Sequence, residues 1–217
     1  MNRFQVWLGV VLLVWVGAIY LWQNPGLYQP RLSASEINEA LHEMEKLPFP
    51  AEERGALLVR ARQWMESDDG QPVYMLNLMR FFPEVRPLPG AQPFQGTPQE
   101  SNALYERVVI PQLLKLGGYP LYAGQTHGGN LLEYAPDLDH WNRVLVVRYP
   151  SRRAFVQLIT SPQYRDVARY KLMALKVVLT PTASELQIPG LPVMAAWASL
   201  VLFLSVGWWR AARRTKS

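Results

Sequence analysis

Two uncharged apolar segments, one near each end of the chain, constrain its fold more than any other feature. Residues 4–22 and 191–209 are each nineteen residues long and carry no charged side chain. A helix rises about 1.5 Å per residue, so each segment reaches roughly 28 Å and matches the ~30 Å hydrocarbon core of a bilayer. Tryptophans stand near the ends of both segments, where indole rings favour the lipid headgroups. The sequence therefore predicts two transmembrane helices, in preference to two buried core helices.

Each segment has one alternative interpretation. The first could be a cleaved signal peptide, but its apolar run is long and no small-x-small cleavage site follows it, so we expect an uncleaved anchor. The second follows Pro189 and Gly190 and precedes a basic tail, a pattern that also resembles bacterial sorting signals removed by membrane proteases. This pattern leaves open whether the C-terminal segment is retained or processed.

Charges beside the two segments predict the topology. Residues 210–217 contain four basic side chains and no acid, and Arg3 precedes the first segment. Basic residues that flank a span stay on the cytoplasmic side of the membrane. We therefore expect a two-pass protein of a bacterial inner membrane. Both termini should be cytoplasmic, and residues 31–185 should be periplasmic or otherwise extracytoplasmic.

The overall charge does not indicate a nucleic-acid partner. The chain has a net charge of +5, but without the five bases that flank the spans it holds 17 basic and 17 acidic side chains. The excess of positive charge is therefore explained by the basic residues that flank the spans, and the rest of the chain shows no basic patch that would indicate nucleic-acid binding. Cysteine is absent from the sequence, which excludes disulfides, thiolate metal sites and a cysteine nucleophile.

The segment between the spans is long enough for one domain with its own core. Residues 33–69 predict a helical hairpin, which begins with a capping box from Ser33 to Glu36. Residues 70–182 then predict the order strand, helix, strand, strand, helix, strand. This order is typical of the ferredoxin-like α+β fold, an antiparallel sheet with helices on one face. The expected strands are residues 72–82, 119–125, 141–149 and 175–182, and the expected helices are 98–116, 152–159 and one that starts at Ser161-Pro162.

A resemblance to a known family rests on four stretches of this region: YMLNLMRF, IPQLLKLGG, WNRVLVVRYPSRRAFVQLITSPQY and RYKLMALKVVL. They resemble a bacterial family of unknown function that is grouped with the dimeric α+β barrels, the antibiotic-biosynthesis-monooxygenase-like superfamily of cofactor-free enzymes. The resemblance covers residues 70–182 and excludes the hairpin and both spans. It implies a ferredoxin-like domain that dimerises into a barrel and acts on a small molecule. Similar sequences often carry a His-Arg pair in the last helix, where this chain has Arg169-Tyr170-Lys171.

Strand alternation divides the first expected strand between two faces. Asn77 shares one face with Met75 and Met79, and Arg80 shares the other with Tyr74. Polar groups in a buried strand need partners, which predicts either structural hydrogen bonds and a salt bridge or contacts to an oxygen-rich ligand. The sheet face that the helices leave uncovered carries apolar residues as well as polar ones, so we expect a second copy of the chain to cover it in a homodimer.

The ligand hypothesis takes its polar groups from strand interiors and strand ends. Among them we favour Arg80, because its guanidinium can hold a carboxylate or quinone oxygen with two hydrogen bonds. For the aromatic candidates, packing in the core is the alternative. None of the three histidines has the spacing of metal ligands, so the sequence predicts neither a metal site nor a cofactor. The candidate ligand-binding residues are Asn77, Arg80, Tyr105, Tyr122, His127 and Trp141.

The middle of the chain is also divided by charge. Residues 33–69 hold nine acidic and four basic side chains, whereas residues 141–176 hold eight basic side chains and one acid. The basic segment could face the acidic hairpin, anionic lipid headgroups or solvent.

Two function classes remain open from the sequence. In the first, a membrane-anchored domain binds, and in some form oxidises or isomerises, a small apolar molecule. In the second, the domain is a noncatalytic interaction module for other cell-envelope proteins. The sequence leaves open whether the protein is an enzyme.

Overall fold

The computed structural model describes residues 3–88, 92–127, 131–132, 140–183 and 190–214. The chain divides into two compact units, and each is considered by itself. The first, which we call the helical-pair unit, joins Met1–Leu27 to Glu185–Ser217, and the second, the central unit, is Tyr28–Ser184.

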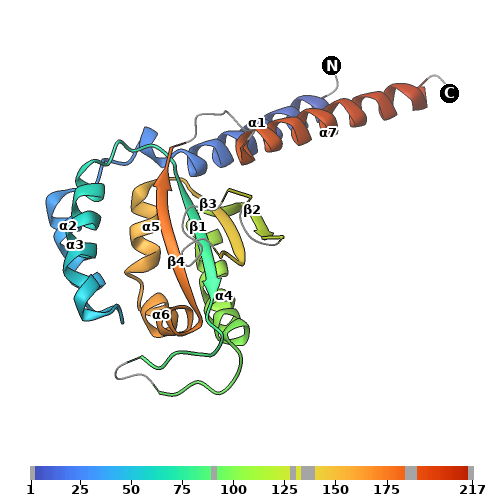
Figure 1. The fold of residues 1–217 in the computed structure, drawn as a ribbon. Helices are drawn as coiled ribbons and strands as arrows, with labels where there is room; N and C mark the ends of the chain where they lie inside the picture. The colour runs from blue at the N-terminus through green and yellow to red at the C-terminus, as the bar shows by residue number, and fades with distance from the viewer. Residues whose placement is uncertain (1–2, 89–91, 128–130, 133–139, 184–189, 215–217) are drawn as a thin grey trace. The chain divides into compact units, whose positions relative to one another are not determined.

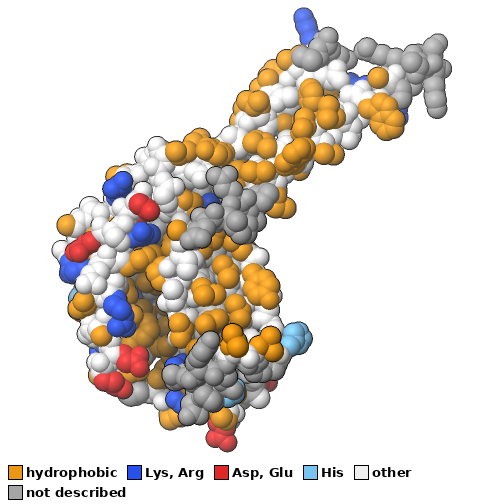
Figure 2. All heavy atoms as spheres, turned by 45° about the horizontal axis from the view of Figure 1, so that its top comes forward, with side chains coloured by type: hydrophobic (Ala, Val, Ile, Leu, Met, Phe, Trp, Pro, Cys, Tyr) orange, Lys and Arg blue, Asp and Glu red, His pale blue; other side chains and the backbone are white. Residues whose placement is uncertain are grey.

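The helical-pair unit consists of α1 (Arg3–Gln23), the short 3-10 helix η1 (Pro25–Leu27) and α7 (Leu191–Arg214). By length and composition, α1 and the Leu191–Ala211 part of α7 are suited to cross a membrane. Hydrophobic side chains are spread over the visible surface of both helices (Figure 2). These features match the two apolar helices that the sequence predicted.

The two long helices pack side by side in opposite directions (Figure 1). A Cβ atom placed on Gly9 would lie 3.3 Å from the Phe203 ring, and one on Gly207 would lie 3.2 Å from the Gln5 side chain. Early residues of α1 therefore meet late residues of α7, which makes the pair antiparallel. Residues without a bulky side chain at such contacts let two helices approach closely in lipid.

The central unit is an α+β fold with one four-stranded antiparallel sheet, in the order β2-β3-β1-β4. The connection from β1 through α4 to β2 and β3, and then through α5 and α6 to β4, is the ferredoxin-like arrangement that the sequence predicted. The elements are α2 (Ala34–Glu45), α3 (Ala51–Glu66), β1 (Val73–Phe81), α4 (Pro98–Lys115), β2 (Tyr119–Gln125), β3 (Arg143–Tyr149), α5 (Arg152–Ile159), α6 (Pro162–Ala174) and β4 (Leu175–Thr182).

Side-chain caps define where four of these helices begin. Ser33 and Thr97 each accept a hydrogen bond from the backbone three residues on and form complete capping boxes. Ser151 and Ser161 cap α5 and α6 in the same way, without the reciprocal glutamate. Such caps satisfy backbone N–H groups that have no partner inside the helix. The two serines are therefore caps, as the sequence indicated, and not candidate nucleophiles.

The helices α4, α5 and α6 cover one face of the sheet. Alternate residues of β1 lie under them, because Met75 and Met79 are each 2% exposed. On this side the core joins strand residues to α4 and α5, and its buried members are Val73, Met75, Val109, Leu113, Val147, Tyr149 and Leu158.

The α2–α3 hairpin packs against α5 and α6 through apolar contacts. Ile37, Leu41 and Met65 bury their side chains against Val156, and Met44 packs with Ile159 in a neighbouring cluster. The hairpin therefore extends the hydrophobic core on the far side of α5.

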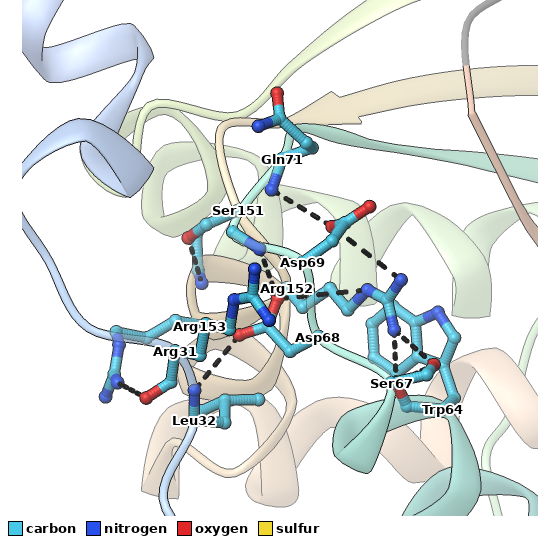
Figure 3. Close-up of polar contacts among 12 residues, drawn as sticks. Arg31, Leu32, Trp64, Ser67, Asp68, Asp69, Gln71, Ser151, Arg152 and Arg153 are labelled. Carbon is cyan, nitrogen blue, oxygen red and sulfur yellow. Dashed lines mark hydrogen bonds and ion pairs between the residues drawn. The ribbon is translucent and has the colours of Figure 1, made fainter.

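Two arginines at the start of α5 fasten the hairpin electrostatically (Figure 3). Arg152 donates a hydrogen bond to Ser67 Oγ at 2.7 Å and lies 3.9 Å from the Asp68 carboxylate. Arg153 pairs with Glu36 and donates to the carbonyl oxygen of Arg31 at 3.2 Å. Hydrogen bonds from Arg153 and then from the Ser33 backbone lower the pKa of the Glu36 carboxyl to about 2. Of the three environments considered for the basic segment, these two arginines therefore face the acidic hairpin.

The other face of the sheet, which we call the open face, carries no helix among the described residues of the central unit. In β1 and β3 it presents Leu76, Leu78, Val144 and Val146, which are directly paired across the two strands and remain partly exposed. Toward the sheet edges the exposure rises, to 57% for Tyr122 and 40% for Val178. Hydrophobic side chains are visible on the surface of this unit in Figure 2. The centre of the open face is therefore apolar and partly exposed, and Arg80, Arg148 and Lys176 add cations to the same face.

Candidate functional site

A cluster of ionisable side chains lies where α4, α6 and β3 meet, on the helix-covered side of the sheet. Glu106 of α4 accepts hydrogen bonds from Arg143 Nη1 at 2.5 Å and from Asn102 Nδ2 at 3.0 Å. Arg143 is directly opposite Met79 in the sheet, which places it on the same side as the buried residues of β1. The carboxylate of Glu106 is therefore already held by two donors.

Lys171 of α6 brings a second cation to the same cluster. Its Nζ atom lies 5.2 Å from the centre of the Tyr105 ring. Among the residues that the structure describes, no acidic side chain lies within ion-pair distance of Lys171. Its side chain is largely buried yet keeps some exposed surface. Within the described part of the chain, Lys171 is thus a cation without a carboxylate at ion-pair distance.

Burial is the main cause that lowers the pKa of Lys171 to about 8. The neighbouring Glu106 opposes this shift, and the neighbouring Arg143 reinforces it. A lysine with such a pKa exchanges its proton close to physiological pH, unlike an ordinary exposed lysine.

Three tyrosines form the aromatic part of the cluster. The rings of Tyr105 and Tyr164 meet edge to face with their centres 5.8 Å apart. Tyr149 of β3 packs edge to face against Phe155, with 5.2 Å between ring centres. Burial raises the pKa of all three tyrosines, so each remains a neutral phenol at physiological pH.

A hydrogen bond from a side chain to the backbone joins the two helices of the cluster, α4 and α6. Ser101 of α4 is fully buried and donates its hydroxyl hydrogen to the carbonyl oxygen of Tyr170 in α6 at 2.8 Å. This bond joins the helix of Tyr105 to the residue that precedes Lys171. The relative position of the phenol and the amine is therefore supported by a buried contact beside them.

Asn77 lies on the helix-covered side and is 5% exposed. Its Nδ2 atom donates to the carbonyl oxygen of Met75 at 3.0 Å and to that of Leu145 at 3.3 Å. These bonds match the structural alternative that the sequence left open for this residue.

Two of the predicted residues, Arg80 and Tyr122, lie on the open face. Arg80 is directly opposite Lys176 in the pairing of β1 with β4. Tyr122 folds its ring over Gly124, since a Cβ atom there would lie 2.5 Å from the tyrosine hydroxyl. The sheet therefore separates both side chains from the cluster around Lys171.

The remaining two predicted residues flank the sheet. His127 is exposed just after β2, and Trp141 lies before β3, where its carbonyl oxygen accepts a hydrogen bond from Thr126 Oγ1. Of the six candidate residues, Tyr105 is the member that meets the ionisable cluster.

Sequence reasoning did not single out Lys171, Glu106 or Arg143. A signal for Lys171 was present, because Tyr164, Ala168 and Lys171 recur at helical spacing and Ala168 is buried in the core. That spacing places a lysine on the core-facing side of α6. The meeting with Glu106 and Arg143 has no local signal, since it joins three separate elements.

The arrangement combines a cation, neutral phenols and aromatic rings beside a carboxylate that is already paired. An ammonium and phenol hydroxyls donate hydrogen bonds to an oxygen atom of a ligand, and the rings offer it apolar contacts. Residues of this kind need no metal, and among the described residues no group of three or more metal-ligating side chains is found.

Comparisons with known proteins find that part of the chain is similar to a protein of unknown function. No protein-family profile and no curated protein sequence match the chain. The crystal structure of RPA0582, a protein of unknown function from Rhodopseudomonas palustris, matches at 30% identity, covering 64% of this chain and 96% of that one, with a TM-score of 0.50. Its methylated form matches at 28% identity over 63% and 95% of the two chains, with a TM-score of 0.48.

A third structure is more distant. SnoaB, a cofactor-independent oxygenase from Streptomyces nogalater, matches at 12% identity over 55% of this chain and 99% of its own, with a TM-score of 0.35. The relationship that the comparisons support is therefore the one to RPA0582. At that identity and coverage, this chain belongs to the same protein family as RPA0582 of Rhodopseudomonas palustris.

Proposed function

We propose that this protein is a membrane-anchored binding protein, whose central unit takes up a small and largely apolar molecule. The observation that carries the proposal is the position of Lys171, a largely buried cation without an ion-pair partner among the described residues, next to the ring of Tyr105. Burying a charge is unfavourable unless something compensates it. A bound molecule with an oxygen atom would supply that compensation.

The proposal extends to chemistry on the bound molecule. The amine of Lys171 exchanges its proton near neutral pH, and the phenol of Tyr105 is close by. Groups of this kind support isomerisation or cofactor-free oxidation of a ligand by moving a proton at one of its oxygen or carbon atoms.

Ligand release from purified protein tests this function. The full-length protein is extracted in detergent, denatured, and its organic extract is analysed by mass spectrometry. We expect a small molecule in stoichiometric amounts from the unaltered protein and from a Tyr74→Phe control on the open face, and less from Tyr105→Phe. An extract that contains only lipid and detergent would contradict the proposal.

We further propose that the central unit forms a homodimer through its open face, which would produce a dimeric α+β barrel. Support comes from the apolar pairs Leu76–Val146 and Leu78–Val144 at the centre of this face. An apolar face in water is unfavourable, and a second identical sheet would bury it in a symmetric contact.

The same open face favours a second candidate function, that of a noncatalytic interaction module for other envelope proteins. Tyr122 and Val178 are exposed apolar side chains that a protein partner could cover as well as a second copy could. Cross-linking in membranes separates the two: a product at twice the mass of the chain supports the dimer, and a product with a different protein supports the interaction module.

For the topology we propose two spans, with both termini in the cytoplasm of a bacterium and the central unit outside the inner membrane. The sequence contains no cysteine, so single cysteines can be introduced as reporters. Val59→Cys on α3 should react with a membrane-impermeant maleimide in intact cells, and Arg213→Cys should react only after lysis. The reverse pattern would invert the topology.

A further inference from the structure

The basic end of the helical-pair unit carries an inference that goes beyond the proposed binding of a small molecule. It rests on the proposal that α1 and α7 cross a membrane. Gly9 of α1 lies against the Phe203 ring of α7, which sets the register of the antiparallel pair. The start of α1 and the end of α7 therefore lie at the same end of the pair (Figure 1), where the guanidinium carbon of Arg210 is 4.0 Å from the centre of the Phe4 ring.

Two arginines of α7 are held against aromatic rings at this end. Arg210 lies over Phe4 of α1, and the guanidinium carbon of Arg213 is 3.8 Å from the centre of the Trp209 ring. Residues three apart on a helix are neighbours, so Arg210 and Arg213 share one side of α7. A ring that covers the plane of a guanidinium leaves the N–H groups at the edge of that plane able to donate. The rings thus hold two forks of hydrogen-bond donors in place.

No carboxylate neutralises these cations within the two helices. Neither α1 nor α7 contains an aspartate or a glutamate, and in the described part of the chain no salt bridge involves either helix. Arg210 Nη1 is shielded from solvent and has no hydrogen-bond partner among the described residues. A shielded donor on a charged group is unfavourable without a partner, and native structures rarely leave one. An oxygen atom of a bound anion would satisfy it.

The position of this donor indicates the kind of anion. It lies at the end of a helix whose preceding turns are apolar and exposed, with Trp208 at 79% and Leu204 at 59%. In a bilayer, the end of such a helix meets the boundary between hydrocarbon and headgroups, where the anions are lipid phosphates. A guanidinium matches a phosphate group with two parallel hydrogen bonds.

We infer that Arg210 and Arg213 form a binding site for the phosphate of an anionic phospholipid, whose acyl chains lie along the exposed apolar surface of α7. Arg210 is the specific contact, because a ring of α1 orients it. Arg3, the first residue of α1, adds positive charge at the same end of the pair. The site is complete only when the two helices are paired, since α7 supplies the arginines and α1 supplies the ring that orients one of them.

Native mass spectrometry of the full-length protein in detergent tests this inference, because it resolves the first lipid that binds. The probes are phosphatidylglycerol, which is anionic, and phosphatidylcholine with the same acyl chains, which carries a phosphate but no net charge. The variants are Arg210→Gln, Arg213→Gln and Phe4→Leu, the last of which keeps the charge and removes the ring. The control Lys216→Gln removes one charge from the basic tail.

We expect the unaltered protein and the control to bind phosphatidylglycerol about tenfold more tightly than phosphatidylcholine. Arg210→Gln and Arg213→Gln should lose most of this preference, and Phe4→Leu should reduce it although its net charge is unchanged. Because Arg213 is exposed, its replacement tests the site even if Arg210→Gln disturbs the packing of the pair. Glycerol phosphate, which carries the anion without acyl chains, should not displace the lipid.

Three results would overturn the inference. Equal binding of the two lipids to the unaltered protein would exclude a site for an anionic lipid. An equal loss of preference for Lys216→Gln and for the site variants would show attraction to the net charge of the tail alone. Displacement by glycerol phosphate would show a site for a soluble phosphate. None of these results bears on the proposed small molecule, which the extraction experiment decides, and a wrong topology would appear in the maleimide labelling instead.

Discussion

Replacing Lys171 by methionine should make the protein more stable, which is unusual for a substitution next to a core. The pKa of Lys171 is about 8 in the folded protein, against 10.5 for an unperturbed lysine. Each pKa unit corresponds to about 1.4 kcal/mol, so holding the protonated amine in the fold costs about 3 kcal/mol at neutral pH. Methionine has a similar length and no charge, and it removes that cost.

The realised gain should be smaller than this upper value. Part of the Lys171 side chain is exposed, so solvent screens the charge. Methionine also loses the cation–π contact to Tyr105, which is worth about 0.5–1 kcal/mol. We therefore expect Lys171→Met to raise the free energy of unfolding by about 1–2 kcal/mol at pH 7.

The stability gained by Lys171→Met should depend on pH. Below pH 8 the folded and the unfolded chain both bind the proton, and the cost is present in full. Between about 8 and 10.5 the folded chain releases the proton while the unfolded chain keeps it, so the stability of the unaltered protein rises with pH. Above 10.5 both forms are neutral, and the advantage of Lys171→Met should be gone.

Urea unfolding of the full-length protein in detergent, followed by tryptophan fluorescence at pH 7 and pH 10.5, measures this difference. The control Lys115→Met removes an exposed cation from the last turn of α4, where it is favourable, and should lose a few tenths of a kcal/mol at pH 7. A loss of stability for Lys171→Met at pH 7, or an equal gain at both pH values, would refute the reasoning.

Three further predictions follow from other parts of the molecule. Gly9→Leu should separate α1 from α7, because a Cβ atom there would already lie 3.3 Å from a ring of α7. The control Gly17→Leu has open space around it. Energy transfer between labels at the two termini should therefore fall for Gly9→Leu alone. Glu36→Gln keeps the capping box but removes the ion pair to α5, so it should cost about 0.5–1 kcal/mol at pH 7. Since the pKa of Glu36 is about 2 against 4.5 for the model carboxyl, that difference is present above pH 4.5 and should disappear as the pH falls toward 2, which hydrogen exchange in α2 can follow. Leu78→Glu on the open face should convert a dimer into a monomer in light scattering while Val59→Glu on α3 does not, and an unchanged dimer would count against the open-face contact.

Local patterns in the sequence were sufficient to predict most of the fold. The alternation of β1 places Asn77 and Arg80 on opposite faces, and the structure confirms this, because the pleat of a strand dictates it. Ser151 and Ser161 begin helices because a cap acts within one turn. These features depend on neighbours in the chain, so sequence reasoning reaches them.

The candidate site was less accessible to sequence reasoning. The alternation of β1 does not say which of its two faces the helices cover, and that choice decides that Asn77 and not Arg80 is buried. Glu106, Arg143 and Lys171 meet because three elements pack together, and no spacing in the sequence relates them. Charge composition did indicate one long-range contact, since the basic segment pairs with the acidic hairpin through Arg153 and Glu36.

The antiparallel pairing of α1 with α7 also affects the conformational entropy of the unfolded central unit. If the two apolar helices stay paired in a bilayer while the chain between them unfolds, that unfolded chain is a closed loop whose ends are held together. A closed loop has fewer conformations than a free chain, and for a covalent cross-link around a loop of ~100 residues this is worth close to 5 kcal/mol in the chain-entropy model. The paired apolar helices would then stabilise the central unit by restricting its unfolded chain, as a disulfide does in a protein that has cysteines. A central unit excised from these helices should unfold more easily than the same residues in the intact chain.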